Sequence, residues 1–169
     1  TSPNVFTKNV AITPLSPSVS GGAVVSYSIA PALPSGLSFD TATGVISGTP
    51  SVISGSSTYT VTAVNSGGST SFGIVITVND SAPSSLSYTS PNIFTRGTTI
   101  TNINPYVQGG AVVSYSISPN LPMGLYFNSL SGVISGTSLI ISDQTSYKII
   151  ASNSGGTTSF DIQITVNDI

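Results

Sequence analysis

The chain of 169 residues contains no histidine, cysteine, tryptophan or glutamate, and only eight of its side chains are charged at neutral pH. Without histidine and cysteine, the sequence excludes imidazole general bases, thiolate nucleophiles and Cys/His metal centres. Its three lysine and arginine residues are too few to neutralise a phosphate backbone, which excludes nucleic acid as a partner. No apolar run reaches the ~18 residues of a membrane-spanning helix, so we expect no membrane insertion by this part of the chain.

The composition that remains predicts strands. Serine and threonine make up 54 residues, close to a third of the chain, while 38% of the residues are apolar and the net charge is −2. Disordered segments combine low hydrophobicity with high net charge, so this chain should fold. Val, Ile, Thr, Tyr and Phe dominate the alternating stretches, and strong helix formers are scarce. We therefore expect an all-β protein.

An internal repeat organises the sequence. Residues Thr1–Thr7 recur almost unchanged as Thr89–Thr95, and the offset of 88 positions then holds without a gap to Asp168. Within 80 aligned positions, 48 residues are identical between the two copies. A repeat of this length suits an independently folding small β domain rather than one turn of a solenoid.

The repeat predicts two domains joined by a polar, proline-bearing linker. We expect the first domain at residues 1–80, the linker at 81–85 and the second domain at 86–169. Leu86 and Tyr88 open the second copy, whereas their counterparts would lie ahead of the first copy. The first strand of the first copy is therefore predicted to be truncated, and the sequence is interpreted as a segment of a longer array.

Each copy contains short alternating segments separated by turn residues, a pattern typical of a β-sandwich. The strands expected in the first copy are Asn4–Thr7, Val10–Thr13, Val24–Ala30, Leu37–Phe39, Val45–Ser47, Thr58–Val64 and Ser69–Val78. Between the last two, Asn65-Ser-Gly-Gly68 predicts a tight hairpin, since Asn and Gly tolerate positive φ. Seven strands in each copy predict two Greek-key immunoglobulin-like sandwiches. The aromatic residues expected in their cores are Phe39, Tyr59, Phe72, Phe127, Tyr147 and Phe160.

One string of residues carries a family resemblance. Leu33-Pro-Ser-Gly-Leu-Ser-Phe-Asp40 is followed by Thr43-Gly-Val-Ile-Ser-Gly-Thr-Pro50, and the second copy repeats the string over residues 121–138. The string resembles the putative-Ig family and the related dystroglycan-type cadherin-like modules, and the resemblance covers essentially the whole chain. It implies tandem extracellular β-sandwiches of large bacterial secreted or cell-surface proteins, with neighbouring Ig-like repeats of the same chain as partners. It implies neither a ligand nor a cofactor.

The resemblance also raises calcium, because cadherin-like modules often hold it at their junctions. The cadherin linker pattern is D-x-N-D-x-x-P, which Asn79, Asp80 and Pro83 match, and Asp168 is the repeat equivalent of Asp80. Thr77 stands where the first Asp of the pattern belongs, and the chain has no glutamate. Calcium needs six to eight oxygen ligands, several of them from carboxylates. Asn79, Asp80 and Asp168 are thus the calcium candidates, and the alternative is a polar strand end that holds no metal.

Two positions are candidates for glycosylation. Thr41, after Asp40, and Ser81, after Asp80, fit the D-(S/T)-small pattern of O-glycosylation in some bacteria. Asn79-Asp-Ser81 also spells an N-glycosylation triplet. Asp-Thr and Asp-Ser are ordinary turn dipeptides as well, which is the structural alternative.

The second copy gains two aromatic residues, since Tyr106 and Tyr126 stand where the first copy has Ser18 and Ser38. Exposed tyrosine is a good adhesive residue, so both are candidates for binding a surface glycan or protein. Local packing is the alternative reading of both rings.

Catalysis is not expected, because the five aspartates are scattered and a glycosidase needs two facing carboxylates. The sequence predicts a non-catalytic extracellular spacer that holds another domain of a bacterial surface protein away from the cell. The alternative is a carbohydrate- or protein-binding adhesive module, with the second copy as the binder.

Overall fold

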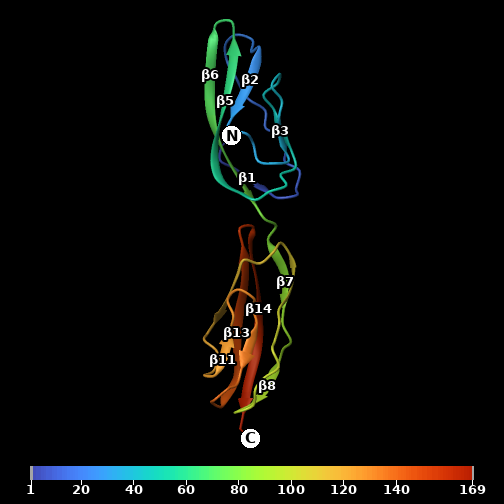
Figure 1. The fold of residues 1–169 in the computed structure, drawn as a ribbon, viewed down its shortest axis with the longest axis vertical. Helices are drawn as coiled ribbons and strands as arrows, with labels where there is room; N and C mark the ends of the chain where they lie inside the picture. Colours follow the sequence, from blue (N-terminus) through green and yellow to red (C-terminus); the bar gives the residue numbers. More distant parts are fainter. Residues whose placement is uncertain (1, 169) are drawn as a thin grey trace. The chain divides into compact units, whose positions relative to one another are not determined.

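Residues 2–168, the part of the chain that this computed structural model describes, contain fourteen β-strands and no helix (Figure 1). The chain divides into two compact units, unit 1 at Thr1–Asp80 and unit 2 at Ser81–Ile169. No helix that could cross a membrane occurs between residues 2 and 168. The all-β prediction is confirmed.

A four-stranded sheet forms one layer of unit 1, in the order β1-β6-β5-β2. Its strands are β1 (Asn4–Thr7), β2 (Ser26–Ala30), β5 (Ser54–Asn65) and β6 (Gly68–Asn79). β5 and β6 form a long antiparallel hairpin that closes at the pair Asn65↔Gly68. Asn65 Oδ1 accepts a 2.8 Å hydrogen bond from the amide of Gly67, which fixes the turn locally. The predicted hairpin is therefore confirmed.

The opposing layer of unit 1 is the hairpin of β3 (Leu37–Phe39) and β4 (Ile46–Gly48), extended by a bridge between Leu15 and Ile46. Gly36 precedes β3 with φ +91°, and a Cβ atom built there would lie 2.0 Å from the carbonyl oxygen of Thr49. Only glycine fits such a position, which explains why the string places one there. The buried residues between the layers are Ile46, Tyr59, Ile74, Ile76 and Val78.

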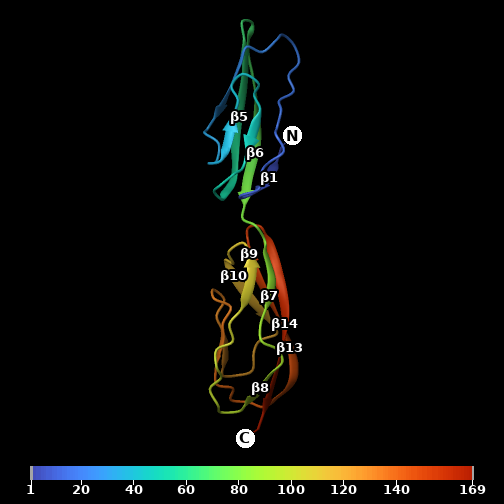
Figure 2. The same cartoon turned by 90° about the vertical axis from the view of Figure 1, so that its right-hand side faces the viewer.

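Unit 2 repeats this plan and adds one strand pair. Its strands are β7 (Pro83–Ser87), β8 (Asn92–Thr95), β9 (Tyr106–Gly109), β10 (Ser114–Ser118), β11 (Leu125–Phe127), β12 (Ile134–Gly136), β13 (Ser142–Asn153) and β14 (Gly156–Asn167). The order β8-β14-β13-β10 reproduces the sheet of unit 1, and β11 pairs with β12. In addition β7 pairs with β9, and the two lie side by side in Figure 2.

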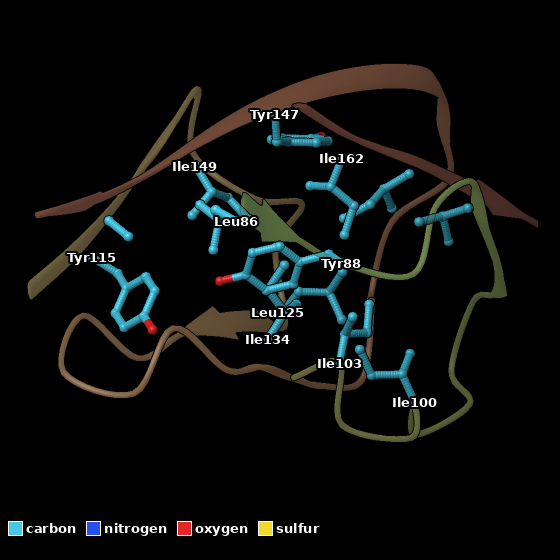
Figure 3. Close-up of a cluster of buried hydrophobic side chains, with 13 residues drawn as sticks. Leu86, Tyr88, Ile100, Ile103, Tyr115, Leu125, Ile134, Tyr147, Ile149 and Ile162 are labelled. Atoms are coloured by element: carbon cyan, nitrogen blue, oxygen red, sulfur yellow. The ribbon is translucent and has the colours of Figure 1, made fainter. Parts of the chain in front are cut away.

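The added strand completes the core of unit 2 (Figure 3). Leu86 and Tyr88 are 5% and 7% exposed. The Tyr88 ring lies in the middle of the cluster in Figure 3, and its centroid is 6.1 Å from that of Phe160. The buried members of the cluster are Leu86, Tyr88, Ile100, Ile103, Tyr115, Leu125, Ile134, Tyr147, Ile149, Ala151, Ile162, Ile164 and Val166.

One core prediction is wrong in unit 1. Phe72, expected in the core, is 61% exposed, whereas its counterpart Phe160 packs against the core of unit 2. In unit 2 the ring of Tyr88 lies beside Phe160, with the two centroids 6.1 Å apart, and residues 2–80 provide no such ring beside Phe72.

Two strand expectations also differ from the structure. Residues 10–13 were expected to form a strand and instead belong to the irregular connection between β1 and β2. Residues 81–85 were expected to be a linker, but β7 begins at Pro83. β7 forms by pairing with β9, a non-local contact that turn chemistry and alternation do not report.

Candidate functional site

Tyr126 is one of the two binding candidates, and it occupies the middle of the short strand β11. Its side chain is 70% exposed, and its backbone pairs with Ser135 of β12. A Cβ atom at Gly136 would lie 3.0 Å from Cδ2 of Tyr126, so the ring lies beside this glycine. The structure therefore places Tyr126 on the outer face of the sandwich, as an adhesive residue requires.

Tyr106, the other candidate, begins β9 opposite Ser87 of β7 and is 60% exposed. Its hydroxyl oxygen accepts a 2.9 Å hydrogen bond from Nε2 of Gln108, two residues along the same strand. The two tyrosines thus stand on different strand pairs, β7–β9 and β11–β12. The two rings therefore do not lie on the same hairpin.

An exposed apolar turn beside β11 escaped the sequence prediction. Met123, Leu139, Ile140 and Ile141 are all exposed, and we refer to them as the turn patch. The amide of Leu139 donates a 2.9 Å hydrogen bond to the carbonyl oxygen of Met123, which brings the two segments of the patch together. The comparison of the two copies could have revealed part of the patch, because unit 1 has serine at positions 35 and 51, the equivalents of Met123 and Leu139.

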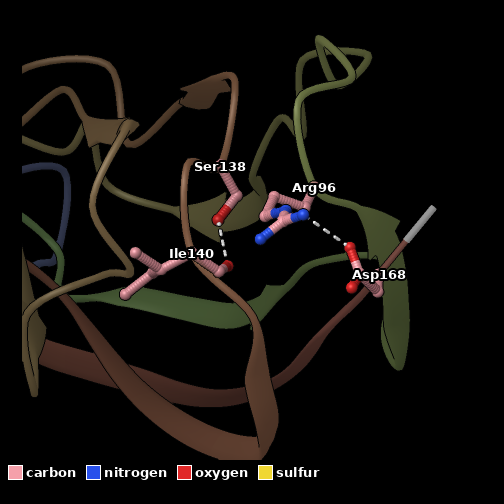
Figure 4. Close-up of polar contacts among 4 residues, drawn as sticks. All are labelled: Arg96, Ser138, Ile140 and Asp168. Carbon is pink, nitrogen blue, oxygen red and sulfur yellow. Dashed lines mark hydrogen bonds and ion pairs between the residues drawn. The ribbon is translucent and has the colours of Figure 1, made fainter.

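A salt bridge lies at the end of β14 (Figure 4). Arg96 Nη2 lies 2.8 Å from Oδ1 of Asp168, and both side chains are about half exposed. Ser138 is buried nearby, and its hydroxyl donates a 3.0 Å hydrogen bond to the carbonyl oxygen of Ile140. An exposed ion pair of this kind contributes ~0–1 kcal/mol to stability.

The calcium candidates lie at strand ends. Asn79 is the last residue of β6, where its carbonyl oxygen accepts a 2.8 Å hydrogen bond from the amide of Lys8, and Asp80 follows it. Asp168 has the equivalent place after β14 and faces the Arg96 guanidinium. Among residues 2–168, no three carboxylate, His or Cys side chains gather closely enough to hold a metal. The described residues thus supply no carboxylate-rich cage, and the assignment of these three residues to calcium stays a prediction.

The glycosylation candidates have backbone roles. Asp40 Oδ1 accepts hydrogen bonds from the amides of Ala42 (2.8 Å) and Thr43 (3.1 Å), and these bonds lower the pKa of the carboxyl group. Thr41, inside that turn, is exposed, and its carbonyl oxygen accepts a bond from the amide of Tyr27. The carbonyl oxygen of Ser81 accepts a 2.7 Å bond from Nδ2 of Asn153. Modification of Thr41 and Ser81 stays a prediction.

The turn at Asp40 recurs in unit 2 with a different chemistry. Asn128 Oδ1 accepts hydrogen bonds from the amides of Leu130 (2.9 Å) and Ser131 (3.0 Å), which are the same two contacts. The geometry therefore survives the loss of the charge. A residue used as a general acid or base would not tolerate that exchange between carboxylate and amide.

Comparisons with known proteins agree with this arrangement. The model of a protein family described as "Putative Ig domain" matches twice, at residues 1–79 and 79–167. The chain is 35% identical over 145 residues to the Serine-rich adhesin for platelets of Staphylococcus aureus, covering 81% of this chain and 6% of that protein. The same adhesin from the USA300 strain is 34% identical over 145 residues. The chain thus spans only a small fraction of these relatives.

Solved structures show the same fold. Extracellular domains 3–5 of Drosophila OTK superpose with a TM-score of 0.53 at 18% identity, covering 98% of this chain and 58% of that one. A variant of titin domains I67–I69 gives a TM-score of 0.53 at 15% identity, covering 97% and 62%. At these identities the likeness concerns the fold alone, and it confirms the predicted immunoglobulin-like sandwiches.

Proposed function

Because the chain belongs to the putative Ig domain family, with two consecutive copies, we propose that it is a non-catalytic spacer segment of a larger bacterial surface protein. In this role it holds another domain away from the cell. The observation that carries the proposal is the turn at Asp40 and Asn128, where the two copies keep the hydrogen bonds and discard the charge. At this turn the geometry is repeated and the carboxylate is not.

The extracellular location has separate support. The chain is similar to part of a staphylococcal protein named as an adhesin for platelets, and an adhesin acts at the cell surface. The polar outer faces, built from serine and threonine rather than charged residues, suit a segment that stands in solvent. Neighbouring Ig-like repeats of the same chain are its proposed partners.

The second candidate function is adhesion by unit 2. The observation that favours it is the exposure of Tyr126 and Tyr106, at 70% and 60%, together with the turn patch. Aromatic residues and methionine are enriched at protein interfaces, and tyrosine offers a large contact area at a low entropic cost. The partner would be a surface glycan or protein.

One double variant separates the two functions. Tyr106→Ser with Tyr126→Ser gives unit 2 the residues that unit 1 carries at the equivalent positions, Ser18 and Ser38. For a spacer we expect the native chain and the variant to be equally silent on a glycan array and against purified surface proteins. Binding that the native chain shows and the variant loses would replace the spacer with the adhesive module.

A replacement experiment tests the spacer directly. The segment is placed between a reporter binding domain and a cell-wall anchor on a bacterial surface, and is then exchanged for an unrelated pair of Ig domains of equal length. We expect the exchange to preserve the reach of the reporter, whereas deletion of the segment shortens it. Loss of reach on exchange would contradict a purely mechanical role.

A further inference from the structure

Unit 1 carries an open groove lined by both apolar and polar side chains. The groove has a volume of about 530 Å³ and continues into a second hollow of about 300 Å³ between the loop at residues 19–24 and the β5–β6 turn. Residues that line the larger part include Leu15, Tyr27, Gly44, Ile46, Phe72 and Ile74. Exposed Phe72 lies on its wall, so a large apolar ring meets solvent there. The polar part of the lining consists of Ser16, Ser18, Ser20, Thr70 and Ser71, and the exposed apolar part is surface that a further segment could cover.

The internal repeat shows what fills the same place in unit 2. There the side chains of Leu86, in β7, and of Tyr88, just after this strand, enter the core, as Figure 3 shows. The Tyr88 hydroxyl donates a 2.8 Å hydrogen bond to the carbonyl oxygen of Gly132, and its ring packs near Phe160. Gly132 and Phe160 are the repeat equivalents of Gly44 and Phe72 in the groove. The lining of the groove is thus the lining of a strand-binding site.

Two glycines at the rim point to the path of the missing backbone. In unit 2 a Cβ atom at Gly109 would lie 2.4 Å from the carbonyl oxygen of Ala82, and one at Gly110 would lie 1.9 Å from that of Ser81. In unit 1 the equivalent Gly21 meets nothing within 4 Å, and the equivalent Gly22 meets only a side-chain nitrogen, that of Asn65, at 3.1 Å. Unit 1 therefore has glycine at both equivalent positions, 21 and 22, although no backbone within residues 2–168 lies close to them.

The edge that would pair with such a strand is also present. In unit 2, β9 pairs with β7 through Pro83↔Gly109, Ser84↔Gln108 and Ser87↔Tyr106. The equivalent residues of unit 1, 18–21, are exposed and form no strand. Unpaired backbone of this kind is a template for an added strand.

The start of the chain is anchored in the same way in both units. Ser2 Oγ accepts a 3.0 Å hydrogen bond from the amide of Val75, and Ser90 Oγ accepts a 2.9 Å bond from that of Gln163. In unit 2 the residue two positions ahead of this anchor is Tyr88. A residue joined ahead of position 1 would therefore enter the groove where Tyr88 enters the core of unit 2.

We propose that the groove of unit 1 is the acceptor site for an extended strand, joined directly ahead of Thr1, that carries an aliphatic residue and a tyrosine two positions apart. The tyrosine hydroxyl donates to the carbonyl oxygen of Gly44, the ring covers Phe72, and the backbone pairs with residues 18–21. The segment between successive repeats is then the first strand of the repeat that follows it. This inference does not depend on whether the segment acts as a spacer or as an adhesin.

The test extends the full chain with the eight residues Ser-Ala-Pro-Ser-Ser-Leu-Ser-Tyr, the sequence of residues 81–88. A matched control extension has serine in place of the leucine and the tyrosine. Residue-resolved amide hydrogen exchange reports on unit 1 alone. We expect the native-pattern extension to slow exchange at residues 18–21 at least tenfold and to shield Phe72 from solvent, and the control extension to do neither. Equal exchange with the two extensions would overturn the proposal.

Two further measurements exclude other occupants. The same eight residues are added as a free peptide to the unextended chain, and sedimentation reports its oligomeric state. Protection by micromolar free peptide equal to that of the joined extension would assign the groove to a strand from another molecule. Dimerisation of the unextended chain that the joined extension abolishes would assign it to a second copy. Either result would overturn the proposal, and their absence, with protection by the joined extension, supports it.

Discussion

The hydroxyl of Tyr88 donates a 2.8 Å hydrogen bond to the carbonyl oxygen of Gly132, and this bond ties the residue that follows β7 to the turn that precedes β12. Tyr88 is buried, so the bond lies in a region where an unmatched polar group is costly. The bond links Tyr88, which precedes the repeated residues 89–168, to a turn within them.

Tyr88→Phe should destabilise unit 2 by ~1–3 kcal/mol, because the ring is retained while the Gly132 carbonyl loses its buried donor. Equilibrium urea unfolding followed by residue-resolved exchange measures the change. Tyr126→Phe is the matched control, since that hydroxyl is on a side chain 70% exposed, and it should have little effect. An equal effect of the two variants would show that the Tyr88 hydroxyl contributes nothing specific.

Unit 2 should lose stability at alkaline pH. Burial raises the pKa of Tyr88 and of Tyr115 above the ordinary value of 10.0. The folded state holds these protons more tightly than the unfolded chain does, so their contribution is complete below pH 10 and is lost as the pH rises above it. The slope is ~1.4 kcal/mol per pH unit for one tyrosine. Urea unfolding at several pH values measures it.

Tyr88→Phe is the control for this pH dependence as well. The variant should retain only the part of the alkaline slope that Tyr115 supplies. A stability of the native unit 2 that stays flat above pH 10 would contradict the burial of both phenols.

Gly124→Ala should severely destabilise the β11–β12 hairpin. Gly124 has φ +94°, and a Cβ atom would lie 2.0 Å from the carbonyl oxygen of Thr137, which is backbone and cannot move aside. The substitution therefore combines strain with a clash, and we expect a loss of more than ~2 kcal/mol. Gly55→Ala is the control, because a Cβ atom at Gly55 meets nothing within 4 Å. Thermal unfolding that treats the two variants alike would contradict the glycine requirement.

Local features of the fold could be predicted from the sequence, whereas features that depend on a distant strand could not. The strand Leu37–Phe39 and the hairpin at Asn65 follow from turn chemistry and alternation within a few residues. The exposure of Phe72 could not be predicted in this way. It depends on a tyrosine that reaches the equivalent ring of unit 2 from outside the repeated core.

The residues of the candidate site could likewise be predicted only in part. Comparison of the two copies identified Tyr106 and Tyr126 because each replaces a serine, and both are exposed in the structure. The same comparison holds for Met123 and Leu139, but apolar residues beside a turn are also compatible with a core position. Only the structure shows that these two side chains are exposed.

Asp40→Asn should leave unit 1 unchanged at neutral pH, because Asn128 makes the same two backbone hydrogen bonds in unit 2. The variant should differ only in acid. Hydrogen bonds from Thr43 and Ala42 hold the pKa of Asp40 below the ordinary value of 3.8, so the native stabilisation is present above that pH and is lost as the pH falls through the folded pKa. Thermal unfolding of both chains at neutral and acidic pH measures it. A large loss at neutral pH would show that the charge itself has a function.

Removal of divalent cations should not change the stability of either unit. The described residues contain no cluster of three carboxylate, His or Cys side chains, and Asp168, one of the three calcium candidates, faces the guanidinium of Arg96 at 2.8 Å. A bound calcium ion would stabilise the folded state by mass action, by ~2.7 kcal/mol at a hundredfold excess over its dissociation constant. Thermal unfolding with EDTA and with calcium chloride tests for this. A midpoint that rises with calcium in the native chain, and not after Asp80→Asn, would assign a metal site to the end of β6.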